Sequence, residues 1–179
     1  MKMIKTLTLL GALATISASV MAGSITGSIG LNGSYTVDTG NVDTATAFTS
    51  FTNVEVGTAT GDFAGLSGTA VVQNTFGFNP STTPLTLWSF SVGATTYSFD
   101  LASLSIASQG DGFLNLKGTG TLFLTGETPT TASWKLTATQ AGAAFEFGDV
   151  QTAQVPDGGA TAMLLGVGLL GLGALRRKA

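Results

Sequence analysis

Hydrophobic and polar residues alternate along the centre of the chain with a period of two. Apolar Trp134, Leu136 and Ala138 are separated by single polar residues, and the same period recurs at residues 54–56, 97–101 and 145–147. Alternation of this kind is typical of strands that bury one face and expose the other. No internal stretch repeats its apolar residues every 3.6 positions over a helical length. The pattern therefore predicts strands and not helices.

Turn-forming residues separate these alternating segments at short spacing. They are Asn32-Gly33, Asp38-Thr39-Gly40, Asn79-Pro80, Gly110-Asp111-Gly112 and Gly126-Glu127-Thr128-Pro129. The segments are rich in Thr and Ser, which favour strands with one solvated face. Many short strands joined by such turns predict an all-β domain, an antiparallel β-sandwich or barrel-like domain, over residues 23–154.

The first 22 residues differ from this pattern and are expected to form a signal peptide. Lys2 and Lys5 give a positive start, and a short uncharged apolar stretch follows. Small residues then precede a predicted cleavage site between Ala22 and Gly23. A buried core helix is the alternative. It is less favoured because the three parts of a signal peptide occur in order at the correct end.

The C-terminal residues 155–179 have three parts. Val155, Pro156, Asp157, Gly158 and Gly159 lead into an uncharged apolar run at 160–175, which is followed by Arg176, Arg177 and Lys178. As a helix, this run would span about 24 Å, less than the ~30 Å of a hydrocarbon core. Its four glycines weaken it further. We therefore expect a transmembrane helix that anchors temporarily, with the basic tail on the cytoplasmic side.

This three-part tail resembles the PEP-CTERM family of sorting signals, in its VPDSG-like variant. The resemblance implies recognition by an exosortase, a membrane-embedded cysteine transpeptidase, and cleavage near residues 156–159. Cleavage would release the domain or pass it to another anchor. An ordinary C-terminal tail anchor or stop-transfer helix is the alternative. Residues 116–134, with Gly118-Thr119-Gly120-Thr121-Leu122, are also similar to a stretch that precedes the signal in many PEP-CTERM proteins.

Charge and composition exclude several functions. Residues 23–155 hold two lysines, Lys117 and Lys135, against nine acidic residues, a net charge of −7. Such a surface repels phosphate backbones, so no nucleic acid is expected as a partner. The chain has no cysteine and no histidine. No disulfide supports the fold, and the commonest general base and transition-metal ligand is missing.

Two loops carry residues that also occur in catalytic or metal sites. Asp38-Thr39-Gly40 copies the loop of aspartic proteases, but those enzymes need two carboxylates that share a proton. Asp38, Asn41, Asp43 and Asp111 offer oxygen ligands of the kind that Ca²⁺ takes, without the spacing of an EF-hand. Solvated turns are the preferred interpretation for both groups.

Three further patterns have a structural and a functional interpretation. Lys117 or Lys135 could activate a serine, but a surface lysine on a strand is favoured. Four aromatic residues could stack on sugars, although aromatic side chains at alternate strand positions are more often in the core: Trp88, Phe90, Tyr97 and Trp134. Asn32-Gly33-Ser34 matches the N-glycosylation triplet, and a hairpin turn is the preferred interpretation.

The sequence thus predicts an exported, non-enzymatic surface or extracellular-matrix protein of a bacterium. It needs no cofactor or metal, and its expected partners are an exosortase, the membrane through residues 160–175 for a limited time, and extracellular polysaccharide. The alternative is a carbohydrate-binding module on the cell surface or in exopolysaccharide. A hydrolase or protease is a third hypothesis, which the missing histidine and cysteine disfavour, although a glycosidase would need only two carboxylates.

Overall fold

The computed structural model describes residues 23–140, 144–146 and 150–152 of the chain. The predicted signal peptide, the predicted sorting signal and Phe147 lie outside the described residues. Ten strands follow one another in the order β1 (Ser28–Val37), β2 (Ala47–Ala59), β3 (Val72–Gln73), β4 (Phe76–Gly77), β5 (Leu85–Val92), β6 (Thr95–Gly110), β7 (Phe113–Leu124), β8 (Thr130–Thr139), β9 (Ala144–Glu146) and β10 (Val150–Thr152). The helical part of the described residues is one short 3₁₀ turn, η1 (Gly61–Phe63).

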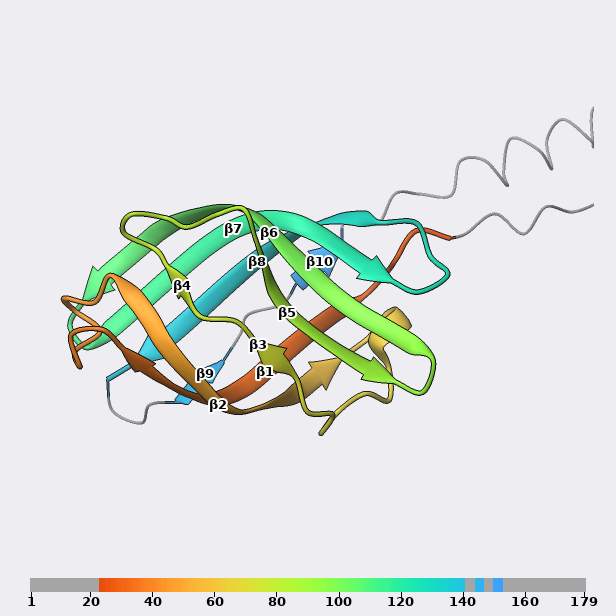
Figure 1. Cartoon of the computed structure of the whole chain (residues 1–179), viewed down its shortest axis with the longest axis horizontal. Helices are drawn as coiled ribbons and strands as arrows, with labels where there is room; N and C mark the ends of the chain where they lie inside the picture. Colours follow the sequence, from red (N-terminus) through yellow and green to blue (C-terminus); the bar gives the residue numbers. More distant parts are fainter. Residues whose placement is uncertain (1–22, 141–143, 147–149, 153–179) are drawn as a thin grey trace, which may run out of the picture.

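All ten strands belong to one sheet, and each neighbouring pair is antiparallel (Figure 1). The order across the sheet is β3-β5-β6-β7-β8-β10-β1-β2-β4, and β9 also lies between β8 and β1. The prediction of an all-β antiparallel domain is confirmed.

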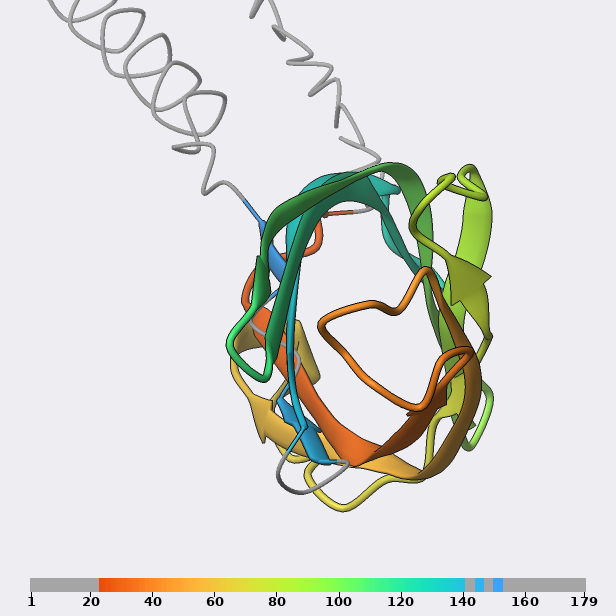
Figure 2. The same cartoon turned by 90° about the vertical axis from the view of Figure 1, so that its left-hand side faces the viewer.

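The sheet curves until its two sides meet, which makes the domain barrel-like. Val56 N donates to Thr69 O and Val71 N donates to Val54 O, both at 2.9 Å, so the segment before β3 lies along β2. β3 itself then pairs with β5 through Val72 and Ser89. Figure 2, turned by 90°, shows the resulting ring of strands. Closure in this way leaves few unpaired backbone groups along the sheet.

Strands β6, β7 and β8 form the longest continuous part of the sheet, here called the wall. β6 pairs with β7 from Tyr97–Leu124 to Gly110–Phe113, and β7 pairs with β8 along ten successive residue pairs. Alternate residues of β8 are buried, namely Ala132, Trp134, Leu136 and Ala138. The alternation of the sequence therefore corresponds to the inner and outer faces of the wall.

Residues 64–84 join the two sides of the sheet between β2 and β5, and they are here called the seam. It contains the two-residue strands β3 and β4 and irregular chain between them. Asn74 completes the edge of β5: its N–H donates to Leu87 O at 2.9 Å and its side-chain amide donates to Thr86 O at 2.8 Å. A side chain thus replaces a strand residue as hydrogen-bond donor.

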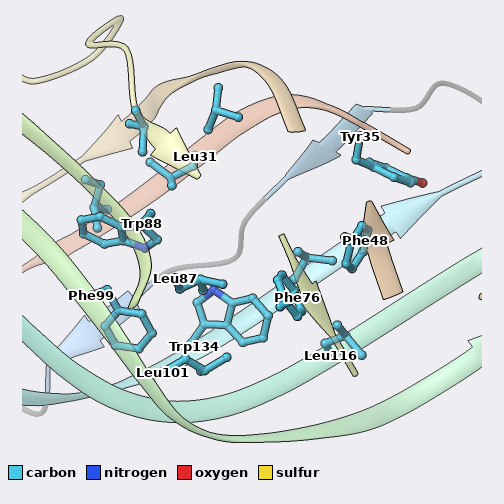
Figure 3. Packing of buried hydrophobic residues seen from close by; sticks show 14 of the residues in the cluster. Leu31, Tyr35, Phe48, Phe76, Leu87, Trp88, Phe99, Leu101, Leu116 and Trp134 are labelled. Carbon is cyan, nitrogen blue, oxygen red and sulfur yellow. The ribbon is translucent and has the colours of Figure 1, made fainter. Parts of the chain in front are cut away.

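The inside of the barrel is filled by side chains from all the long strands (Figure 3). Trp88 stacks on Phe99 with ring centroids 6.1 Å apart, and Phe76 meets Trp134 edge-on at 6.0 Å. Phe48 lies 5.2 Å from Phe76. Burial of one large side chain of this kind contributes about 1.5–3 kcal/mol to folding.

One predicted turn is wrong. Asn32-Gly33 lies inside β1, where Asn32 pairs with Glu55 of β2 and Gly33 pairs with Phe145 of β9. Partners on both sides hold this dipeptide in extended backbone, which overrides its preference for a hairpin turn. The predicted turns at residues 38–40, 110–112 and 126–129 do connect strands, and Asn79-Pro80 lies in the loop between β4 and β5.

Candidate functional site

The described chain begins and ends at the same end of the barrel, here called the terminal end (Figure 1). Thr128 N donates to Gly23 O at 2.9 Å, and Ser24 forms a parallel bridge with Thr128. At the other terminus, Thr152 of β10 pairs with Ala132, at the start of β8. The partners of Gly23 and Thr152, which are Thr128 and Ala132, are therefore only four residues apart in the chain.

β10 is an integral strand of the sheet, because it has a partner on each side. Gln151 pairs with Ser133 of β8 and with Ser28 of β1. The predicted motif begins at Val155, only three residues after the last residue of this strand. The residues expected to be processed thus follow directly on the folded domain. Ala22, on the other side of the predicted signal cleavage, lies outside the described residues.

The loop of residues 38–46 crosses the opposite end of the barrel, here called the far end (Figure 2). One carboxylate oxygen of Asp38 accepts hydrogen bonds from Thr39 N and Thr46 N, both at 3.0 Å. The Thr46 hydroxyl donates to the other oxygen. This hydroxyl, followed by the backbone N–H groups, lowers the pKa of Asp38. The ionised Asp38 carboxylate therefore stabilises the fold at any pH above the ordinary carboxyl pKa. This stabilisation is lost as the pH falls through the lowered pKa of Asp38.

Asp38 therefore shapes the loop, and the turn interpretation of Asp38-Thr39-Gly40 is confirmed. The candidate calcium ligands have the same role: Asn41 Oδ1 accepts from Asp43 N at 2.9 Å, and Asp43 Oδ1 accepts from Gly112 N at 2.8 Å. Across the described residues, no group of three or more acidic side chains lies close enough to hold a metal ion. The oxygens of this loop thus connect it to itself and to the β6–β7 turn.

Two glutamines that the sequence analysis did not single out hold the same loop through their side chains. Gln109 donates its side-chain amide to Val42 O at 2.7 Å and to Ala45 O at 2.8 Å. Gln140 Oε1 accepts from Val42 N at 3.0 Å. Val42 and Ala45 are buried. The far end is therefore closed by packed and hydrogen-bonded chain.

A cavity of about 160 Å³ lies beside this loop, lined by Tyr35, Thr36, Val37, Gly40, Val42 and Gln140. The Tyr35 hydroxyl donates to Thr139 O at 2.7 Å, and burial raises its pKa. The Thr36 hydroxyl bonds to the hydroxyls of Thr49 and Ser50, and the lining set contains no carboxylate or amine. The cavity brings together no acid–base pair.

The four aromatic residues considered as a sugar-stacking platform are all core residues. Trp88 and Trp134 are each 1% exposed, while Phe90 and Tyr97 are 6% and 8% exposed. Phe90 and Tyr97 stack on each other with ring centroids 4.8 Å apart. The preferred interpretation is confirmed, and these side chains present no face to a sugar.

Lys117 and Lys135 pair directly with each other across β7 and β8, on the outer face. Ser105 pairs with Lys117 on the other side, but its hydroxyl faces the Lys117 carbonyl oxygen at 3.5 Å. Both lysine side chains are exposed. The interpretation as surface lysines on strands is confirmed.

Comparison with protein families decides the identity of the C-terminus. Residues 154–179 match the family described as VPDSG-CTERM motif. These residues are a PEP-CTERM-like C-terminal sorting signal. Gly158 stands where the motif has serine. The sorting signal starts two residues after Thr152 and implies a membrane-associated step of export to the cell surface, with a processing protease or transpeptidase as partner.

Other comparisons return nothing: the chain matches no curated protein and no solved structure. Among the residues that the structure describes, no helix is long and apolar enough to cross a membrane. The span predicted at residues 160–175 and the basic residues 176–178 are part of the sorting signal and lie outside the described residues.

Proposed function

We propose that this chain is an exported, non-enzymatic protein of the bacterial surface or extracellular matrix, cleaved by an exosortase near residues 156–159. The observation that carries the proposal is the match of residues 154–179 to a sorting signal. The position of that signal, directly after a strand paired on both sides, adds support. A short stretch of chain between folded domain and apolar run is the segment that a membrane enzyme would act on.

The physical chemistry of the tail supports removal over permanent anchoring. Pro156 breaks regular structure and the two glycines after it give the chain freedom to enter an enzyme in extended form. The apolar run is short and rich in glycine, so it holds the bilayer only marginally. The basic cluster at 176–178 stops translocation and fixes where the cut falls relative to the membrane.

The outer face of the domain supports a structural role in a hydrated matrix. Its hydroxyl and amide groups bond across strands: Ser103 to Thr119 at 2.7 Å, and Thr137 to Asn115 at 2.8 Å. Carboxylates take part in similar bonds, as in Thr86 to Asp100 at 2.7 Å. Such a surface is polar with few charges, which suits contact with extracellular polysaccharide. A carbohydrate-binding module that uses the four core aromatics is not proposed.

Mass spectrometry of the protein recovered from cells and from medium tests this function. The expected product begins at Gly23 and ends within residues 156–159. Replacement of residues 156–159 by alanine should leave the chain inserted and uncut. Deletion of residues 176–178 should leave it unprocessed because translocation no longer stops.

A double variant, Lys117→Ala with Lys135→Ala, is the matched control. It also removes basic residues, but from the exposed outer face of the domain, and it should be processed like the wild type. If wild-type protein on cells still carries Arg176, Arg177 and Lys178, the tail is a permanent anchor and the proposal is wrong.

A further inference from the structure

The start of the described chain is fixed to the turn between β7 and β8. Besides the bond from Thr128 N to Gly23 O, Ile25 N donates to the Thr130 hydroxyl at 3.0 Å. The Ile25 side chain is 1% exposed and belongs to the core. Gly23 is therefore positioned by the fold even though it precedes the first long strand.

Glu127 lies beside Gly23 in this arrangement. A side-chain carbon built on Gly23 would lie 3.0 Å from Glu127 Oε2. Since the nitrogen of a residue is about 2.5 Å from its own Cβ position, Glu127 Oε2 lies at most about 5.5 Å from the Gly23 nitrogen. A rotamer change brings a glutamate oxygen over that remaining distance. Glu127 is partly buried, so the contact is not fully in solvent.

No other cationic group competes for this carboxylate among the described residues. The two lysines there, Lys117 and Lys135, lie seven residues along β7 and β8 from Leu124 and Thr128, about 23 Å away along the strands. Asp62 is a second carboxylate that could attract the new ammonium group, since it bonds to Thr26, three residues after Gly23. It is already engaged: it accepts from Thr26 N at 2.6 Å and from the Thr26 hydroxyl at 3.2 Å.

We infer that removal of the signal peptide after Ala22 creates an ion pair between the new α-ammonium group of Gly23 and the Glu127 carboxylate, which ties the mature N-terminus to the β7–β8 turn. In the uncut chain, the Gly23 nitrogen is a neutral amide and cannot form this pair. Cleavage hydrolyses the Ala22–Gly23 peptide bond with one water, leaving a carboxylate on Ala22 and the amine on Gly23, which takes up a proton. The inference rests on the proposed export.

The consequence is that export and folding reinforce each other at the terminal end. A positive charge appears at the moment of cleavage, next to a carboxylate that has no other described cation in reach. The pair adds to the backbone bonds of Gly23 and Ile25, so the mature end stays on the β7–β8 turn and does not fray.

Titration of the α-amino group tests the pair in the exported full chain. Protein is recovered after secretion through its own signal peptide and briefly methylated with formaldehyde and cyanoborohydride at a series of pH values. Mass spectrometry of the N-terminal peptide gives the fraction modified at Gly23. Wild type should titrate about half a pKa unit above Glu127→Gln, because a carboxylate favours the protonated amine.

Glu55→Gln is the matched control, since Glu55 is an exposed glutamate on β2 that pairs with Asn32. It should titrate like the wild type. A second variant carries one alanine inserted between Ala22 and Gly23, which moves the ammonium about 3.5 Å along the chain and should lower its pKa to that of Glu127→Gln.

Equal titration of wild type and Glu127→Gln would overturn the ion pair, and so would a mature chain that starts at another residue. Neither result concerns the C-terminal cut, which is measured on the other terminal peptide. Conversely, a chain that keeps residues 176–178 contradicts the proposed sorting but leaves the N-terminal titration valid.

Discussion

The wall and the seam close the same barrel by different means. In the wall, β6, β7 and β8 pair over ten or more residues, and alternate side chains are buried along β8 and in the first half of β6. In the seam, residues 64–84 close the gap between β2 and β5 with two strands of two residues each, and with the side-chain amide of Asn74. The wall depends on long, regular backbone pairing, whereas the seam combines short backbone contacts with the side-chain amide of Asn74.

This difference implies different tolerance to substitution. The wall has many equivalent hydrogen bonds. Its strands approach so closely, however, that even a small increase in side-chain volume lowers its stability. The seam is open at its surface, where a shallow groove is lined by Phe48, Phe76, Thr82 and Leu85 among others. Side chains in the seam have room to adjust, so we expect a substitution there to lower the free energy of unfolding less than one in the wall, and to affect a smaller region.

The largest expected effect is that of a single methyl group in the wall. A Cβ atom at Gly120 would lie 2.2 Å from Asp100 O and 2.5 Å from the Phe99 ring. Gly120→Ala should therefore lower the free energy of unfolding by about 3 kcal/mol, measured by urea denaturation. Gly77→Ala, the same change in the seam, meets Pro80 O and Thr82 at 3.1 Å and should lose under about 1 kcal/mol. Equal losses of unfolding free energy in the two variants would show that the wall is no more tightly packed than the seam.

A medium effect is expected from Asn74 in the seam. Asn74→Ala leaves Thr86 O without its donor and should lower the free energy of unfolding by about 1 kcal/mol. Amide hydrogen exchange should become faster in β3 and β5 specifically. Asn115→Ala in the wall removes bonds to Ser108 and Thr137 only, and should cost less than about 0.5 kcal/mol. Uniform acceleration over the whole barrel would contradict a locally held seam.

The smallest effect concerns the paired lysines on the outside of the wall. Like charges directly opposite each other on a sheet are unfavourable, so Lys135→Glu should raise the free energy of unfolding by about 0.5 kcal/mol at low salt. The gain should shrink as salt screens the new pair. Lys117→Glu together with Lys135→Glu restores two like charges and should cancel it. A gain that persists in the double variant would have another origin.

Strand β8 and the first half of β6 were predictable from the sequence, and the seam was not. Trp134, Leu136 and Ala138 alternate with polar residues because one face of β8 is core and the other is solvent. The seam has no such period, since β3 and β4 are each too short to show it. Asn32-Gly33 misled for a related reason: a local turn preference is weaker than strand partners on both sides.

The functional residues divide in the same way. The sorting signal was visible because its three parts are adjacent in the chain and are recognised by composition. Gln109 and Gln140 gave no signal, because their role comes from the loop at residues 38–46, about 65 to 100 positions earlier in sequence. Glu127 beside Gly23 likewise depends on the fold bringing two distant segments together.

The short distance between β10 and the sorting motif limits how far from the folded domain the chain can be cut. From Thr152 to Gly159 there are seven residues, and extended chain covers at most about 3.6 Å for each. An enzyme that cuts within residues 156–159 must therefore bring its reactive group to within about 25 Å of the folded barrel. It must work close to Thr152 at the end of β10, which would make the clearance between barrel and bilayer a limit on which processing enzymes fit.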